Sequence, residues 1–231
     1  MSARYYLSLW LLGCVEWAAL WLLVLQWPTW WLPAILAAWA TADAGSYVFH
    51  VFLDHHLRPE DSPMAAGFQR HHYDQLGIVR EPIPVVLAPV VPLLLPVWML
   101  AAAPAVLGWL SPWWALYLCT LALGVGFGQL FHRWSHMDQP GRLIGIAQRA
   151  RLLVGKTAHD EHHKPPHGSH YAIVSGWSNP MFDALGMDRL VGRLAARAGF
   201  PRVVEGPSAE DLARAKRPLQ GLVPFPDLRH G

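Results

Sequence analysis

Cysteine, charge and the motifs of soluble binding proteins are all scarce in this chain. Its two cysteines, Cys14 and Cys119, lie in apolar runs, so we expect neither a disulfide framework nor a thiolate metal site. Charged residues make up only 15% of the sequence, and no lysine or arginine occurs within residues 5–57 or 81–132. The chain also lacks an internal repeat, a glycine-rich phosphate loop and a basic nucleic-acid-binding pattern. These absences argue against a secreted disulfide-bonded domain, a nucleotide-binding protein and a nucleic-acid partner.

What the sequence has in excess is apolar side chains. Hydrophobic residues make up 53% of the 231 positions and 13 residues are tryptophan, which is unusual for a soluble domain. Crossing the hydrocarbon core of a bilayer takes ~20 apolar residues. Four segments approach or exceed that length, namely residues 5–26, 30–53, 83–110 and 113–131. We therefore predict an all-α membrane protein with four transmembrane helices, the third of which is kinked or re-entrant at its prolines.

The distribution of charge predicts how these helices are oriented. All 18 lysines and arginines fall on one side of the four-helix arrangement, whereas the opposite loops, residues 27–33 and 108–114, are uncharged and rich in tryptophan. By the positive-inside rule, both termini are then cytoplasmic. Segments 54–82 and 132–187 would form a histidine-rich helical cap on the cytoplasmic side. We expect a multi-pass protein of a bacterial inner membrane.

Two acidic residues, Glu16 and Asp43, lie inside predicted spans. A charge in the middle of a bilayer costs ~2.5–3.5 kcal/mol on insertion scales, so each side chain should face the interior of the bundle. A hydrogen-bonded contact between helices and a functional role are both compatible with this placement.

The chain changes character after its apolar part. Residues 1–187 hold the four apolar segments and nearly all the histidines, and we predict that they form one domain. In the remainder, 188–231, arginines recur every four residues over 189–197, which predicts a short amphipathic helix lying on the membrane. Residues 205–231 contain four prolines and little periodicity, so we predict an extended tail in which His230 serves no site.

The histidines concentrate on the predicted cytoplasmic side, in clusters with helical spacing. The clusters are His50 with Asp54 one turn later, the pair His71 and His72, the pair His132 and His136, and the trio His159, His162 and His163. Residues three or four apart share one helix face and can aim their imidazoles at one point. A single pair is commonly an ordinary surface feature, but four clusters on one membrane face favour a metal site. Histidines in this number, without matching glutamates, suit two metal ions bound mainly through nitrogen, and imidazole suits iron among other metals.

In combination, these motifs resemble those of the Kua-type membrane lipid desaturases, which include plasmanylethanolamine desaturases and a plant plastid desaturase of phosphatidylglycerol. The matching stretches are "ADAGSYVFHVFLD", "FQRHHYD", "GQLFHRWSH", "HDEHHKPP" and "YAIVSGWSNPMFD", which cover about residues 40–185. The resemblance implies a non-haem di-iron enzyme that uses dioxygen and two electrons to remove two hydrogens from a lipid chain.

The resemblance also implies roles for individual residues. The family's metal ligands correspond to His50, His71, His72, His132, His136, His159, His162 and His163. Candidates for supporting these ligands are Asp54, His167, His170, Tyr171 and Asn179. His55 and His56 have no counterpart in the family pattern, and we predict that they are exposed loop histidines.

The sequence leaves two substrates open, a plasmanyl ether lipid and the acyl chain of a phospholipid. The stretch after "FQRHHYD" departs from the animal ether-lipid enzymes, and "HDEHHKPP" with "YAIVSG" is nearer to the plant acyl-lipid branch. Because His50, His132 and His136 lie where their spans end, we expect the double bond to form near the glycerol end of the lipid.

Partners and alternative functions follow from the same features. The desaturase interpretation requires a membrane lipid and a small electron carrier, either a ferredoxin or a b-type cytochrome, with its reductase. Basic residues on the cytoplasmic side suit lipid phosphates or an acidic carrier, although the positive-inside rule alone explains them equally well. The alternatives are a lipid hydroxylase on the same di-iron scaffold and a non-enzymatic membrane metal-binding protein.

The predicted topology is testable by cysteine labelling. Single cysteines introduced at His72 and His163 should be accessible from the same membrane face, because both predicted cytoplasmic segments lie there. Labelling of the two positions from opposite faces would contradict the topology.

Overall fold

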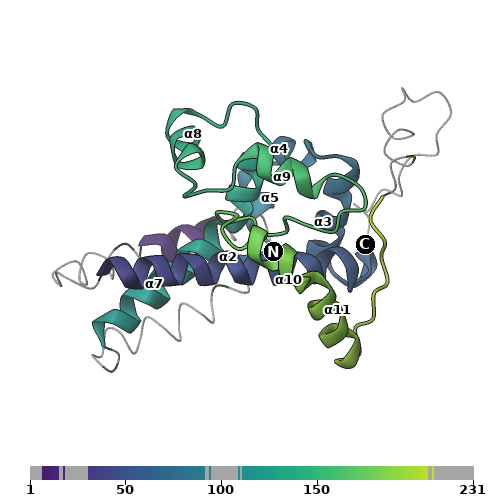
Figure 1. Cartoon of the computed structure of the whole chain (residues 1–231). Helices are drawn as coiled ribbons and strands as arrows, with labels where there is room; N and C mark the ends of the chain where they lie inside the picture. Colours follow the sequence, from purple (N-terminus) through teal and green to yellow (C-terminus); the bar gives the residue numbers. More distant parts are fainter. Residues whose placement is uncertain are drawn as a thin grey trace.

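The computed structural model describes residues 7–15, 18, 31–91, 94, 109, 111–207 and 210. Every regular element within these ranges is a helix, which confirms the all-α part of the predicted fold class (Figure 1). The elements are α2 (Trp31–His55), the 3-10 helix η1 (Pro59–Asp61), α3 (Pro63–Tyr73), α4 (Gly77–Arg80), α5 (Ile83–Leu87), α7 (Pro112–Ser135), α8 (Arg142–Arg149), α9 (Lys156–His162), α10 (Asn179–Leu185) and α11 (Met187–Arg197). Glu16, most of the third predicted span and nearly all of the predicted tail, His230 included, lie outside the described residues.

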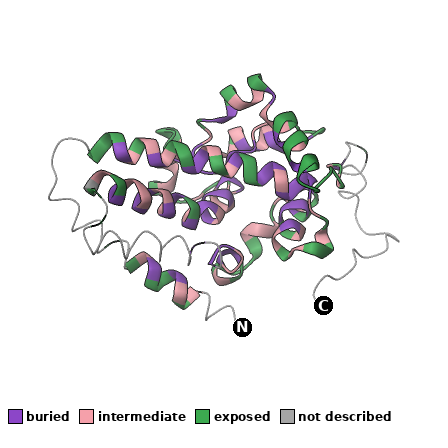
Figure 2. Ribbon diagram, turned by 90° about the horizontal axis from the view of Figure 1, so that it is seen from below, coloured by how far each residue is buried: buried purple, intermediate pink, exposed green. Residues whose placement is uncertain are grey.

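Helices α2 and α7 lie side by side and form the long arm of the molecule (Figure 1). Figure 2 shows buried residues along one side of each helix and exposed residues along the other. Ala34 packs with Ala115 near the start of both helices, and a Cβ added at Gly124 would lie 2.6 Å from the Cβ of Ala42. Small residues therefore allow the two backbones to approach closely. Since the helices run in the same direction, their C-terminal ends, which carry His50 and His132, meet.

The described residues contain one helical stretch, Trp113–Ser135, that is long and apolar enough to cross a membrane. Helix α2 has 25 residues, but it carries the polar side chains of Asp43, His50 and Asp54. The third predicted span begins with the short helix α5 followed by a turn at residues 88–90. The four-helix membrane arrangement therefore stays a prediction.

Asp43 links α2 to the loop that precedes α10. Its side chain is fully buried, and Oδ1 accepts hydrogen bonds from the N–H groups of Ser175 (2.6 Å) and Gly176 (2.8 Å). Oδ2 accepts from the N–H (2.8 Å) and the hydroxyl (2.7 Å) of Ser178. The predicted inward orientation of Asp43 is thus confirmed, but its partner is a loop and not another helix.

The segment after α11 folds back over the end of α2. His55 Nδ1 lies 3.1 Å from the carbonyl oxygen of Val204, and His56 Nδ1 lies 2.9 Å from that of Phe200. His55 and His56 are only 1% and 4% exposed, so the prediction that they are exposed loop histidines is wrong. The physical reason is this returning segment, whose Phe200 ring packs on Phe52 and excludes solvent.

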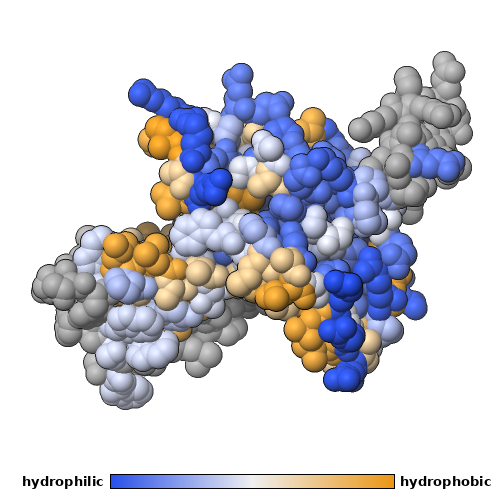
Figure 3. Space-filling view, viewed as in Figure 1, coloured by the Kyte–Doolittle hydropathy of each residue, from blue (hydrophilic) through white to orange (hydrophobic). Residues whose placement is uncertain are grey.

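Strongly hydrophilic residues on the surface gather away from the arm formed by α2 and α7 (Figure 3). Figure 3 shows strongly hydrophilic residues over α8, α11 and the histidine-bearing end, whereas the arm formed by α2 and α7 is pale or orange. The predicted amphipathic segment is indeed the helix α11, with Val191 and Ala195 buried and Leu190 and Leu194 more exposed. The position of α11 on a membrane stays a prediction.

Removing the Asp43 carboxylate should destabilise the protein strongly. Asp43→Ala leaves three backbone N–H groups and one hydroxyl without an acceptor, at about 1–3 kcal/mol each, so we expect a total loss of about 4 kcal/mol or more. The measurement is unfolding of the detergent-solubilised protein, followed by circular dichroism. Asp160→Ala is the matched control, because Asp160 forms a partly exposed ion pair with Lys156 worth less than about 1 kcal/mol. Equal effects of the two substitutions would refute the structural role of Asp43.

Candidate metal centre

Two overlapping groups of buried histidines lie where α2, α3, α7 and α9 converge. The His136 group comprises His71, His132, His136, His159 and His163, and the His50 group comprises His50, His71, His72 and His162. Within each group the candidate ligand atoms all lie within 4.8 Å of one another. Together the groups contain all eight histidines proposed as ligands from the sequence, and His71 belongs to both.

The local sequence explains how each helix presents its histidines. In α9, His159 and His162 share the buried face and His163 caps the helix, while Lys156 and Asp160 pair on the outer face. In α7, His132 lies one turn before His136, which is the C-cap residue. The i, i+3 and i, i+4 spacings therefore become convergent imidazoles once the helix ends meet.

Backbone carbonyls fix the orientation of several rings. His50 Nδ1 donates to the carbonyl of Tyr171 (2.8 Å), His162 Nδ1 donates to that of Ser169 (2.9 Å), and His71 Nδ1 donates to that of Phe68. In each ring the other nitrogen, Nε2, is buried and makes no hydrogen bond. This arrangement is typical of metal-binding histidines, in which one nitrogen is held by the protein and the other faces the ion.

The donor set fits metal ions. Seven buried nitrogens from six of the eight histidines have no hydrogen-bond partner, and His132 contributes two of them. Leaving a buried polar atom unpaired costs about 1–3 kcal/mol, so such a concentration calls for a partner of another kind. In the His136 group, His159 Nε2 lies 3.1 Å from His136 Nε2 and 3.2 Å from His163 Nε2. Neighbouring ligands around one ion with bonds of about 2.1 Å are separated by roughly 3.0–3.4 Å.

Burial favours the neutral form of four imidazoles in the cluster. Loss of hydration lowers the pKa of His71, His159 and His163 far below the usual 6.5, and lowers the pKa of His136 to about 3. Neighbouring histidines add to the effect, because a second positive charge in the cluster would be repelled. At neutral pH each of these four rings therefore has a lone pair available for a metal ion.

Asp54 adds a single buried carboxylate to the His50 group. Its Oδ2 lies 3.0 Å from His72 Nε2, 3.3 Å from His50 Nε2 and 3.4 Å from His162 Nε2, and only the contact with His72 has hydrogen-bond geometry. One negative charge is thus shared among three imidazoles, which favours the approach of a cation.

The other predicted supporting residues differ in their contacts. Tyr171 donates its hydroxyl proton to the carbonyl of His167 (2.5 Å), and His167 Nδ1 lies 3.1 Å from His72 Nδ1. The Asn179 side chain accepts a hydrogen bond from the backbone N–H of Ala172 and donates one to its carbonyl oxygen. These two bonds hold the backbone next to Tyr171. His170 instead faces Asp183 (3.2 Å) and belongs to neither histidine group.

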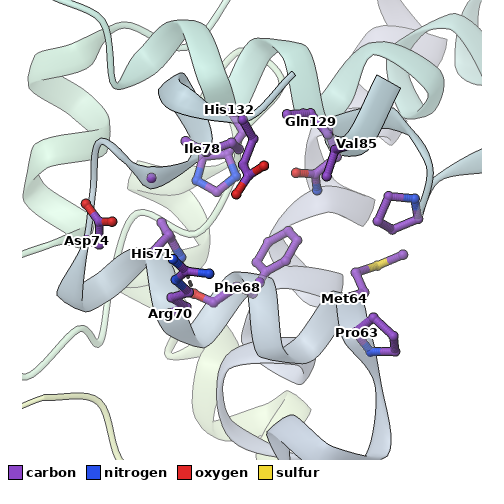
Figure 4. Close-up of a pocket in the computed structure, with 15 residues that line it drawn as sticks. Pro63, Met64, Phe68, Arg70, His71, Asp74, Ile78, Val85, Gln129 and His132 are labelled. Atoms are coloured by element: carbon purple, nitrogen blue, oxygen red, sulfur yellow. Dashed lines mark hydrogen bonds between the residues drawn. The ribbon is translucent and has the colours of Figure 1, made fainter. Parts of the chain in front are cut away.

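Several residues that shape the site were not predicted from the sequence. His55 Nε2 lies 2.9 Å from the hydroxyl of Tyr171. Phe68 and Gln129 line a cavity of about 280 Å³ that His71 and His132 also border (Figure 4). Gln129 precedes His132 by three residues on α7, and this helical spacing was a signal in the sequence that could have identified it.

Comparison with known proteins gives consistent matches. The family described as "Lipid desaturase domain" matches residues 39–198, a range that includes all eight histidines. The plasmanylethanolamine desaturase of Myxococcus xanthus is 33% identical over 115 residues, 48% of this chain and 40% of that protein. Fatty acid desaturase 4, chloroplastic, of Arabidopsis thaliana is 32% identical over 163 residues (65% and 49%), and plasmanylethanolamine desaturase 1 of Mus musculus is 26% identical over 159 residues (65% and 56%). The chain thus matches about half the length of these curated relatives, and no solved structure matches it.

The neutral histidines predict that the metal-free protein is sensitive to acid. The pKa of His136 is about 3 in the fold and about 6.5 in an unfolded chain, so below pH 6.5 only the unfolded chain takes up the proton. Stability should therefore fall as the pH is lowered from about 6.5, by up to about 1.4 kcal/mol per pH unit for each such histidine. Unfolding of the metal-free protein between about pH 7 and pH 5 measures this slope, and His136→Gln should reduce it. A flat profile would contradict the buried, neutral state.

Proposed function

Because the chain belongs to the lipid desaturase domain family, we propose that it is a dioxygen-dependent di-iron desaturase of membrane lipid chains. The observation that carries the proposal is the pair of histidine groups that share His71, in which the donors are imidazoles joined by one carboxylate. Two iron ions bound there would supply dioxygen activation and the two-electron oxidation of the chain. In the balanced reaction, –CH2–CH2–, O2, two electrons and two protons give –CH=CH– and two molecules of water.

The chain's own residues bind, orient and shield the reacting groups in this proposal. The Nε2 atoms of His50 and His162 serve as ligands, and the carbonyls of Tyr171 and Ser169 hold their rings in position. Asp54 supplies negative charge next to these ligands. The buried ring of Phe68 lies 4.8 Å from the ring of His50, and it limits the access of water from the cavity side.

The proposed setting is a membrane, with the histidine groups at the cytoplasmic ends of α2 and α7. In support of this orientation, Trp31 and Trp109 are 40% and 75% exposed near the opposite end of the arm, as interfacial tryptophans are. On the face shown in Figure 3 the described part of the arm between the two ends is pale or orange, without strongly hydrophilic residues. We extend the proposal to four membrane helices with both termini cytoplasmic, in a bacterial inner membrane.

The substrate and electron donor follow from this placement. A lipid in the cytoplasmic leaflet would keep its headgroup at the polar end of the cavity near His71 and His132, so the double bond would form close to the glycerol. The relatives are named for plasmanylethanolamine and for fatty acids, so an ether chain and an acyl chain are both candidate substrates. Electrons would come from a ferredoxin or a b-type cytochrome that docks on the cytoplasmic face.

Lipid mass spectrometry of cells with and without the gene tests the function. We expect a new double bond that requires both the gene and dioxygen, and a loss of about 100-fold or more in His132→Ala and His163→Ala, because a missing ligand releases the metal. His230→Ala is the control and should retain full activity.

The identity of the product separates the candidate reactions. An acid-labile vinyl ether selects the plasmanyl substrate, and unsaturation near an acyl carbonyl selects the acyl substrate. A hydroxylated lipid as the product would show that the reaction is a hydroxylation and not a desaturation. Unsaturation only in mid-chain would exclude the reaction near the glycerol, and full turnover by His163→Ala would exclude this ligand set.

A further inference from the structure

A second cavity, of about 340 Å³, lies between α2 and α7 beside the histidine groups. Most of its lining is apolar, including Phe49, Leu121, Val125 and Ile173. The volume is at the lower end of the range for small-molecule sites, roughly 300–1,000 Å³, which suits one flexible chain. No ion pair of the described residues lies within this cavity, so its chemistry favours a hydrocarbon.

The glycines that line this cavity are of two kinds. Gly124 allows α2 and α7 to pack, since an added Cβ would lie 2.6 Å from Ala42. At Gly45 and Gly128, by contrast, an added Cβ would meet no atom within 4 Å. Gly128 is nevertheless buried, so its missing side chain contributes to the volume of the cavity and is not required by helix packing.

The cavity adjoins the cavity at the histidine groups. Met64, Phe68 and Gln129 line both spaces. In Figure 4, Phe68 lies between the end bordered by His71 and the end bordered by Met64. The Phe68 ring centroid is 5.5 Å from that of His132, so a chain passing Phe68 would run directly beside the candidate ligands.

The two cavities differ in polarity at their far ends. The first is bordered by Arg70, Asp74 and Glu81, which suit the polar part of a lipid. The second opens beside Phe49 and Val125, which are 40% and 38% exposed on the apolar arm. The two adjoining cavities together are polar at one end, bordered by His71 and His132 in the middle and apolar at the other end.

On these grounds we propose that the α2–α7 cavity binds the saturated tail of the substrate lipid, while carbons nearer the headgroup lie beside His71 and His132. The inference rests on the proposed function for the identity of the reacting chain, but the binding site itself is defined by the cavities. Lateral entry past Phe49 and Val125 would let a lipid pass from the bilayer into the site without crossing water.

Leucine substitutions that fill the cavity test the proposal. Gly128→Leu and Gly45→Leu project side chains into space that is open in the structure, and leucine is a better helix former than glycine. We expect turnover of long-chain lipids to fall about tenfold or more, with a shift towards shorter chains, while metal content and helicity stay unchanged. The matched control is Gly145→Leu on α8, which lines neither cavity.

Photocrosslinking of the full-length, metal-loaded protein gives a readout independent of turnover. The probe is phosphatidylethanolamine whose saturated chain carries a diazirine at its last carbon. It should label residues 41–49 or 121–128 in the wild type and in Gly145→Leu, and Gly128→Leu should lose this label. If Gly128→Leu does not fold, Gly45→Leu carries the same test, since position 45 is on the exposed side of α2.

The outcomes distinguish the two proposals. If the diazirine probe labels the α2–α7 cavity of a wild-type protein that makes no double bond, the tail site is supported and the desaturase function is contradicted. Lipid desaturation with the label elsewhere, or with long-chain turnover unchanged in both leucine variants, would overturn the tail site and leave the desaturase function standing.

Discussion

The burial of eight imidazoles in one place is the constraint on which the rest of this structure depends. Histidines lose their hydration when they are buried, and seven of the ring nitrogens in the cluster have no hydrogen bond in exchange. Metal ions bound by the cluster would supply partners for such nitrogens. Without metal ions, burying these ring nitrogens therefore destabilises the fold, and bound metal ions would offset that free-energy cost.

Other features of the fold hold this cluster together. Glycine at position 124 lets α2 and α7 approach each other, so that His50 and His132 meet at the helix ends. Asp43 anchors the 175–178 loop to α2, and the preceding residues of that loop orient the rings of His50 and His162 through backbone carbonyls. The segment after α11 covers His55 and His56 and closes the site from the other side.

The sequence predicted the local part of this site better than the long-range part. The spacing of His159, His162 and His163 predicts one helix face, and α9 is that helix. Spacing carries no information on the contact between His50 and the carbonyl of Tyr171, which are 121 positions apart. It likewise carries none on Asp43 and Ser175, which are 132 apart. The burial of His55 and His56 was missed for the same reason, because a distant segment covers them.

The cavities also could not be predicted from patterns in the sequence. A glycine in an apolar helix can mark close packing, as Gly124 does, or open space, as Gly45 and Gly128 do, and only the neighbouring atoms distinguish the two cases. The family relationship indicates a lipid desaturase, whereas these contacts indicate where a lipid chain could lie.

Metal analysis of the purified full-length protein, combined with X-ray absorption at the iron edge, tests the central claim most directly. The account expects about two iron ions per chain, each surrounded by nitrogen and oxygen neighbours with the scattering pattern of imidazole and no sulfur. Zinc as the only native metal, or sulfur in the coordination sphere, would contradict it.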